Sequence, residues 1–310
     1  MLTRRSFFRQ SIFATGGFFI NSLSNCTVPK IKISLAEWSL HRSLQSGRID
    51  NLNFPTIAKN KFGIDTVEYV NGFFKTSTKD FKEVAKDEKY LNELLVRSKD
   101  AGVYNHLIMV DDEGSLAIPD DKERLLAVDN HKKWLDAAKH LGCATVRVNL
   151  HGEGGAEDKL NASADSLSRL GEYAAGLNLN VVIENHGSHS SNGKWVAQVM
   201  KTVNKPNVGT LPDFGNFCIS HPWGQTQDPC ENEYDRYTGV TDLLPFAKGV
   251  SAKTYDFDAN GLQPKMDYER LIGIVKQSGF TGYIGIEFEG NTGDEEEGIK
   301  WTKRLLERYL

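Results

Sequence analysis

Short runs of apolar and β-branched residues recur eight times along the chain, and stretches with helical periodicity separate most of them. The eight runs cover residues 31–36, 66–70, 104–110, 144–150, 180–183, 208–211, 249–253 and 283–288. A strand that is covered on both faces reads as a continuous apolar run, so each of these segments has the pattern of a buried strand. Strands that alternate with helices predict βα units around a parallel sheet.

The helical pattern is clearest over residues 82–102, 123–142 and 165–178. Three helices are expected to end at glycines that precede a strand, namely Gly102, Gly142 and Gly279. Residues 218–240 are rich in proline, glycine and acidic residues, which favours a long loop after the sixth strand.

Eight βα units in about 280 residues match the size of a (β/α)₈ barrel, which is typically ~250 residues. A doubly wound sheet is the alternative, but neither a GxGxxG motif nor a P-loop follows any predicted strand. No linker or shift in composition marks a second domain. The sequence therefore predicts a single-domain α/β protein, a (β/α)₈ TIM barrel over residues 27–310.

Acidic residues close three of the last four predicted strands. In a barrel, the ends of parallel strands meet at one rim, so Glu184, Asp213 and Glu287 should lie close together. Buried carboxylates repel one another unless some are protonated or a cation lies between them. A salt bridge or a helix cap would explain one such acid, but three together favour a divalent metal site. Oxygen ligands suit Mg²⁺ or Mn²⁺, while His186 leaves room for Co²⁺ or Zn²⁺.

A family resemblance rests on four segments at these strand ends. They are IENHG, LPDFGNF, GVSAKTYDFD and GYIGIEFEG, at residues 183–187, 211–217, 249–258 and 282–290. They resemble the sugar phosphate isomerase/epimerase family, the xylose isomerase-like TIM barrels of the AP endonuclease 2 superfamily, over nearly the whole mature chain. The resemblance implies that Glu184, Asp213 and Glu287 bind a divalent metal. It also implies that Glu184 and Glu287 exchange protons with the sugar carbon next to the carbonyl.

The chain departs from the family pattern at two positions. Ser251 stands where many members have a metal-binding histidine in an HxK motif, although Lys253 of that motif is retained. Asn216 stands where ketose epimerases often have a histidine. These departures disfavour a free-ketose 3-epimerase. The metal shell is then expected to be completed by water or by a histidine from a neighbouring loop, the candidates being His186, His151 and His221.

Other residues near the strand ends are candidates for substrate contacts. Lys253 could hold a carbonyl or enolate oxygen, or pair with one of the carboxylates, and the two roles are compatible. The aromatic faces of Trp38 and Trp223 would suit the apolar side of a sugar ring. Structural polar contacts or core packing are the alternative explanation for the weaker candidates, which are His186, Glu68, His151, Trp38, Asn216 and His221.

The charge and the cysteines exclude some classes of function. The formal net charge is −4, and lysine and arginine are scattered along the chain. Both features argue against a nucleic-acid partner and against an endonuclease activity. The four cysteines have neither the short paired spacing of a zinc site nor the density of a disulfide scaffold. We expect no catalytic cysteine.

The first 26 residues have the pattern of an export signal. A basic start precedes an uncharged, largely apolar run over residues 11–20, which is too short to span a bilayer comfortably. The sequence TRRSFF at residues 3–8 resembles a twin-arginine motif. LSNC at residues 23–26 resembles a lipoprotein cleavage box, although Asn25 is atypical, so lipid attachment at Cys26 stays open. We expect a periplasmic protein without a membrane span, and a homo-oligomer is compatible with the sequence.

These features predict a metal-dependent isomerase or epimerase that acts on a carbohydrate. Glu184 or Glu287 would remove the proton α to a carbonyl group, and the metal with Lys253 would stabilise the enediolate. The alternative is a periplasmic 3-keto-glycoside lyase that uses the same metal and base for β-elimination. A non-catalytic sugar-binding barrel is the alternative from a different class.

Overall fold

The computed structural model describes residues 31–224, 229–291 and 293–310, so the predicted export signal and Cys26 lie outside the described residues. The strands are β1 (Lys32–Ala36), β2 (Thr66–Val70), β3 (Tyr104–Met109), β4 (Thr145–Val148), β5 (Asn180–Glu184), β6 (Val208–Leu211), β7 (Val250–Thr254) and β8 (Tyr283–Phe288). The α-helices are α1 (His41–Gln45), α2 (Phe54–Phe62), α3 (Phe81–Val84), α4 (Glu88–Asp100), α5 (Asp121–Leu141), α6 (Ala156–Leu177), α7 (Gly193–Val203), α8 (Arg236–Leu243), α9 (Tyr268–Gln277) and α10 (Glu295–Tyr309).

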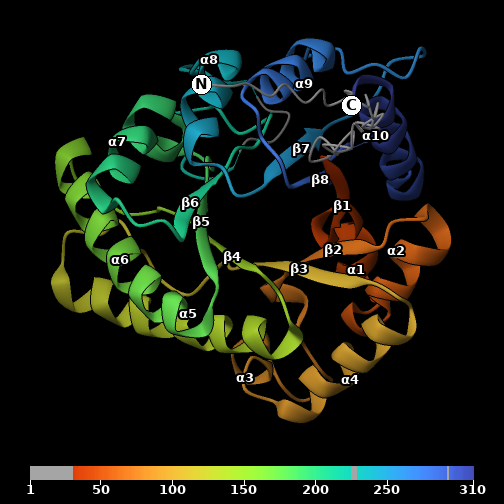
Figure 1. The fold of residues 1–310 in the computed structure, drawn as a ribbon, viewed down its shortest axis with the longest axis horizontal. Helices are drawn as coiled ribbons and strands as arrows, with labels where there is room; N and C mark the ends of the chain where they lie inside the picture. Colours follow the sequence, from red (N-terminus) through yellow and green to blue (C-terminus); the bar gives the residue numbers. More distant parts are fainter. Residues whose placement is uncertain (1–30, 225–228, 292) are drawn as a thin grey trace, which may run out of the picture.

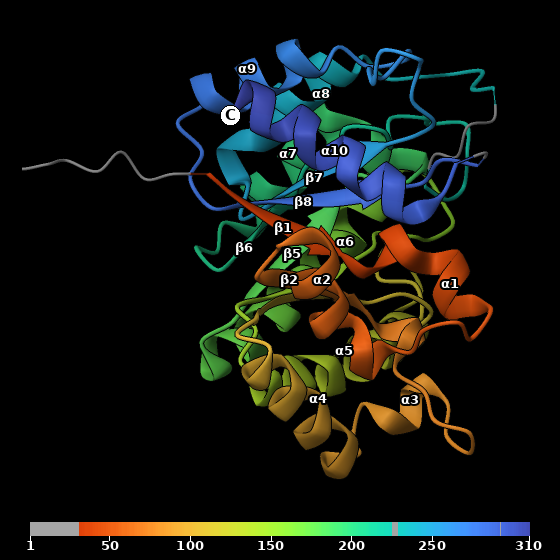
Figure 2. The same ribbon diagram turned by 90° about the vertical axis from the view of Figure 1, so that its right-hand side faces the viewer.

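The strands form one parallel sheet that curls into a nearly closed barrel. Their order is β6-β5-β4-β3-β2-β1-β8-β7, and isolated parallel bridges, Thr210 to Ala247 and Asp213 to Ser251, join the two edges. The helices are arranged around the ring of strands (Figure 1), and a side view shows β1 running between β2 and β8 (Figure 2). The predicted (β/α)₈ TIM barrel is confirmed. No helix in the described part of the chain is long and apolar enough to cross a membrane.

The predicted strands agree with the observed ones to within two residues, whereas two predictions between the strands were wrong. The helix predicted over residues 82–102 is two helices, because the side chain of Asp87 caps α4 by accepting from the Lys89 and Tyr90 amides. The loop predicted over residues 218–240 is shorter, because Asp235 caps α8. The glycines predicted to end helices, Gly102, Gly142 and Gly279, do adopt the left-handed conformation.

Two polar side chains, Ser34 of β1 and Glu68 of β2, meet in the barrel interior, to which alternate residues of each strand point. Ser34 donates a hydrogen bond to Glu68, and a Cβ on Gly285 would lie 2.7 Å from Glu68 Oε2. Only a glycine on β8 leaves room for this carboxyl group. Burial raises the pKa of Glu68 to about 7. Glu68, which was predicted to contact substrate at the rim, is therefore a buried residue of the barrel interior. It is not among the residues that line the cavity at the carboxyl end of the barrel, described below.

A second buried acid, Glu37, directly follows β1. Its carboxyl group accepts hydrogen bonds from Asn51 Nδ2 and from the Val70 amide at 2.9 Å. Burial outweighs these bonds and raises the pKa of Glu37 from 4.5 to about 8. A carboxyl group whose pKa is higher in the folded state than in the unfolded state stabilises the fold most at pH values below its pKa in the unfolded state. This contribution to stability is lost as the pH rises through its pKa in the folded state. Glu37 therefore makes the fold less stable as the pH rises from 4.5 towards 8.

We expect Glu37→Gln to make the pH dependence of stability shallower between pH 5 and pH 8. One such group contributes a slope of about 1.4 kcal/mol per pH unit, and a neutral amide removes it. Urea unfolding at both pH values measures the slope. Glu297→Gln, at an exposed acid of α10, is the control and should keep the wild-type slope. Equal losses of stability in wild type and Glu37→Gln between the two pH values would contradict the role of Glu37.

Candidate active site and metal centre

Three carboxylates meet at the carboxyl end of the barrel. Glu184 ends β5, Asp213 follows β6 by two residues, and Glu287 lies near the end of β8. All three are buried, and each offers an oxygen within 4.8 Å of the others. The cluster predicted from the strand ends is therefore present.

Asn185 holds Asp213 in place. The Asn185 amide group donates to the backbone carbonyls of Asp213 and Asn216, both at 3.0 Å, while its oxygen accepts from the Asp213 amide at 2.8 Å. The amides of Gly215 and Asn216 donate to Asp213 Oδ1 at 2.6 and 2.8 Å. Asn185, which follows Glu184, thus fixes the position of Asp213. This contact explains why residue 185 has an amide side chain.

Two residues of β7 hold Glu287. Ser251 and Lys253 are two positions apart and so point to the same face of the strand. The Ser251 hydroxyl lies 2.7 Å from Glu287 Oε2 and 2.9 Å from Asp213 Oδ2, and Lys253 Nζ lies 2.8 Å from Glu287 Oε1. Lys253 also pairs with Glu289 at 3.0 Å. The ion pair predicted as one role of Lys253 is confirmed.

Glu184 has a different environment, dominated by Arg147 of β4. Arg147 Nε lies 2.9 Å from Glu184 Oε2, but the two are not aligned as a hydrogen bond, and Glu184 Oε2 has no other partner in the described chain. Arg147 Nη1 bonds Asp111 at 2.7 Å, and Asn216 Nδ2 donates to Glu184 Oε1 at 3.3 Å. Sequence reasoning missed Arg147, although a lone charge in the strand TVRV was a signal.

The pKa values of the three acids are shifted in different directions. Burial raises the pKa of Glu184 well above its ordinary value despite the nearby Arg147. Burial also raises the pKa of Asp213 to about 6. Burial acts on Glu287 as well, but Lys253 and the Ser251 hydroxyl bring the pKa of Glu287 below its ordinary value. When neighbouring acids have pKa values shifted in opposite directions, the acid with the raised pKa can accept a proton and the acid with the lowered pKa stays ionised.

The three acids fit a hard divalent ion. They are oxygen donors on three different strand ends, and Glu184 Oε2 is a buried acceptor without a hydrogen bond. An acceptor of this kind is costly unless a ligand satisfies it. No histidine joins the set among residues 31–224, 229–291 and 293–310. Ser251 stands at the position of the family histidine and hydrogen-bonds Asp213 and Glu287. Water would therefore complete the coordination shell of an ion held by the three acids.

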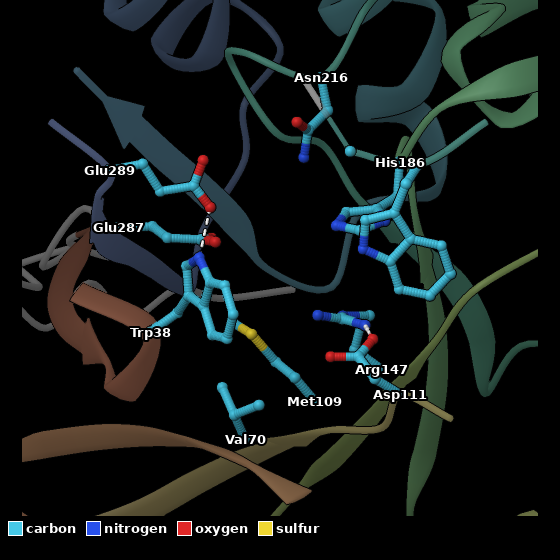
Figure 3. Close-up of a pocket in the computed structure, with 11 residues that line it drawn as sticks. Trp38, Val70, Met109, Asp111, Arg147, His186, Asn216, Glu287 and Glu289 are labelled. Atoms are coloured by element: carbon cyan, nitrogen blue, oxygen red, sulfur yellow. Dashed lines mark hydrogen bonds and ion pairs between the residues drawn. The ribbon is translucent and has the colours of Figure 1, made fainter. Parts of the chain in front are cut away.

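A cavity of about 110 Å³ opens beside the cluster (Figure 3). Trp38, Glu287 and Glu289 form one side of it, and Arg147 with His186 lies opposite. The Trp38 indole donates to Glu289 Oε1. Charged groups and two tryptophans, Trp38 and Trp223, line the cavity, and an aromatic lining with a few polar groups is usual for small-molecule sites.

The segment that carries Trp223 closes another wall of this cavity. A Cβ on Gly187 would lie 2.3 Å from the Trp223 carbonyl oxygen, and one on Gly224 would lie 2.5 Å from the His186 ring. Two glycines thus let this segment pack on the end of β5. A disulfide between Cys218 and Cys230 closes the segment, which the cysteine spacing did not predict.

The structure brings some of the predicted contact residues together and separates others. Trp38, His186 and Asn216 line the cavity. His151 lines a neighbouring cavity, where its ring stacks on Trp223 at 3.9 Å. His221 lines neither of these two cavities, and its Nε2 lies 3.2 Å from the Pro229 carbonyl.

Comparison with known proteins places the fold in a family. A family model described as "Xylose isomerase-like TIM barrel" matches residues 58–308. The chain is 23% identical over 320 aligned positions to the 3'-dehydrocarminate deglycosidase alpha subunit of a Microbacterium species, covering 80% of this chain and 85% of that protein.

Solved structures show the same fold. The 3-keto-D-glucoside 4-epimerase from E. coli is 13% identical with a TM-score of 0.62, covering 89% of this chain and all of that one. The IolI protein with a bound zinc atom is 16% identical with a TM-score of 0.64, covering 90% of this chain and 99% of that one.

Proposed function

The chain belongs to the xylose isomerase-like TIM barrel family, and we propose that it is an enzyme that removes a proton from the carbon next to a carbonyl group of a carbohydrate. One observation carries the proposal. Glu184 is a buried carboxylate at the mouth of the barrel, and one of its oxygens has no hydrogen bond among the described residues. Burial raises the pKa of this positioned acid above its ordinary value, which favours uptake of a proton from a bound substrate.

The other charged groups of the site have complementary roles. A divalent ion held by Glu184, Asp213 and Glu287 would polarise the substrate carbonyl. Arg147 lines the cavity beside Glu184 and is placed to balance negative charge that develops on the substrate oxygen. Lys253 is buried behind the acids, so its role is to keep Glu287 ionised instead of touching the substrate.

The hydrogen bonds of Glu287 favour elimination over epimerisation. Epimerisation through two bases needs a second acid that can return a proton to the opposite face of the carbon. Glu287 is the second acid implied by the family resemblance, but Lys253 and Ser251 occupy its two oxygens. Among the described residues, Glu184 Oε2 is the one carboxylate oxygen of the three acids that accepts no hydrogen bond, although Arg147 Nε lies 2.9 Å away. A reaction with one base suits the 3-keto-glycoside lyase, while an isomerase or epimerase remains the second candidate.

The elimination needs no co-reactant. Glu184 takes the proton from C2 of a 3-keto-glycoside, the C–H electrons form a C2–C3 double bond, and the carbonyl electron pair moves to the C3 oxygen. The enolate then re-forms the carbonyl, the C1–C2 double bond forms and the bond from C1 to the glycosidic oxygen breaks. The leaving oxygen takes up a proton and Glu184 releases the one it removed, so the products are an unsaturated keto sugar and an alcohol, and the base is restored. The names of the deglycosidase and the 3-keto-glucoside epimerase among the similar proteins support a 3-keto sugar as substrate.

We also propose that the enzyme acts outside the cytoplasm. The pattern of residues 1–26 is typical of export, and the disulfide between Cys218 and Cys230 is typical of an oxidising compartment. Changing Arg4 and Arg5 to lysine should leave precursor in the cytoplasm if the twin-arginine route is used, which cell fractionation measures.

Deuterium uptake tests the proposed reaction. The purified protein is first analysed for bound metal and is then incubated in D₂O with 3-keto-glycosides and free ketoses. We expect deuterium at the carbon next to the carbonyl in recovered substrate, together with an unsaturated keto sugar from the glycosides. Deuterium uptake with an epimer as the product would favour the second candidate. If neither substrate class exchanges deuterium or reacts, the proposal fails and a sugar-binding barrel is favoured.

A further inference from the structure

A second cavity of about 140 Å³ adjoins the first one at the ends of β3 and β4. Residues 110–115 form much of its lining, and His131, Asn149, His151 and Trp223 form the rest. Asp111 and Trp223 line both cavities. The two cavities therefore lie next to each other and share these two side chains as a wall.

Buried contacts hold the wall of the second cavity in one conformation. The Asn71 side chain exchanges two hydrogen bonds with the backbone of Asp111, at 2.8 and 3.0 Å. The Ala117 amide donates to the His151 carbonyl at 2.9 Å. A Cβ on Gly152 would lie 2.4 Å from the Ala117 backbone, so the loops after β3 and β4 are in close contact. The cavity is thus a built feature of the fold.

Two residues that line this cavity have a buried polar atom with no hydrogen-bond partner among the described residues. The Asn149 side chain is only 6% exposed and its Nδ2 donates to Asp111 at 2.6 Å, but Asn149 Oδ1 has no hydrogen bond within the described residues. The same holds for His151 Nε2. An unsatisfied buried acceptor is costly, and a ligand that donates a hydrogen bond would remove the cost.

The lining offers oxygen acceptors. They include the carboxylate of Asp112 and the oxygen of Asn149, whereas within the described chain Lys133 and Trp134 donate to Glu113 at 2.8 and 2.7 Å. Asp112 adopts a left-handed conformation with φ 58°. Trp223 is 45% exposed and offers an aromatic surface. Acceptors beside an aromatic surface match a ring that carries hydroxyl groups on its edge and C–H groups on its face.

We propose that the second cavity binds the leaving group of the glycoside, and that this group is a second sugar ring. The substrate would then be an oxidised disaccharide, with the keto sugar beside Glu184 and the second ring against Asn149, Asp112 and Trp223. This inference rests on the proposed function for the identity of the first ring. The two-ring binding site itself rests on the cavities alone.

Two 3-keto-glucosides that differ only in the leaving group test the proposal, one with methyl and one with glucose. We expect kcat/KM to be about tenfold higher for the disaccharide, as one or two good hydrogen bonds would produce. Asn149→Leu should reduce this ratio at least fivefold. Asp112→Asn keeps the left-handed backbone accessible and should also reduce the ratio, so the test does not depend on one variant folding. Asp100→Asn, at the exposed end of α4, is the matched control and should keep the wild-type ratio.

A binding measurement separates failure of this inference from failure of the proposed function. Calorimetry with Glu184→Gln compares the unoxidised disaccharide with methyl glucoside, and no turnover is needed. Tighter binding of the disaccharide, weakened by Asn149→Leu, supports the second subsite even if neither keto substrate reacts. Equal affinities, together with equal kcat/KM values if the keto substrates react, would overturn it.

Discussion

Replacing Glu184 by glutamine should lower kcat on a 3-keto-glycoside by about a thousandfold, within the range that removal of a general base produces. Deuterium exchange should be lost to the same extent, because glutamine cannot take up the proton. The fold should survive, since Arg147 keeps its pair with Asp111 at 2.7 Å and the amide oxygen of the new side chain can still accept from Asn216 Nδ2, which lies 3.3 Å from Glu184 Oε1. Steady-state kinetics and exchange in D₂O measure the two effects.

Two further variants identify the cause of that loss. Glu287→Gln should also lower turnover, but through weaker metal binding, because Glu287 is an ionised member of the three-acid cluster. Because Glu184 belongs to the same cluster, exchange is measured again with metal added to saturation: Glu287→Gln should then regain activity, whereas Glu184→Gln should not. Glu297→Gln, at an exposed acid of α10, should behave as wild type. Wild-type rates of exchange in Glu184→Gln would show that another group is the base.

Replacing Lys253 by methionine should destabilise the fold by about 3–5 kcal/mol, the usual cost of removing one partner of a buried ion pair. Lys253 Nζ lies 2.8 Å from Glu287, 3.0 Å from Glu289 and 3.7 Å from Asp213, and all four side chains are buried or mostly buried. Methionine preserves the length of the side chain but leaves the acids without their cation. Urea unfolding at pH 7 in the presence of a chelator measures the loss.

The pH dependence tests the electrostatic origin of that loss. The pKa of Glu287 lies below its ordinary value chiefly because Lys253 opposes the effect of burial, so the ionised form needs the lysine. At pH 5 the acids of the variant can protonate, and the difference from wild type should shrink. Lys300→Met removes an exposed lysine paired with Glu297 and should change nothing measurable. A loss that is the same at pH 5 and pH 7 would point to packing instead of charge.

The apolar runs and the direction of the chain were enough to predict the barrel and its acidic rim. A parallel strand buried on both faces is mostly apolar, so β2, β6 and β8 could be predicted with their observed bounds, although β2 and β8 each contain one glutamate. All eight strands run the same way, so their carboxyl ends share one rim, and Glu184, Asp213 and Glu287 had to meet there.

The properties of those acids depend on contacts that local patterns do not encode. The ion pair of Arg147 with Glu184 joins β4 to β5, and that of Lys253 with Glu287 joins β7 to β8. Only closure of the barrel and exclusion of water determine which acid stays ionised and which keeps a free oxygen, because a pKa responds to burial and to neighbouring charges.

The sequence by itself therefore determined the architecture of this protein and the position of its acids. The tertiary structure decided which of these acids has a raised pKa and which is held ionised by hydrogen bonds and charge. It also decided that Trp223, held in a segment closed by Cys218 and Cys230, would lie between two cavities. The reason is physical: strand periodicity is a local property of the chain, whereas hydrogen bonds, pKa shifts and cavity walls arise between residues that only folding brings together.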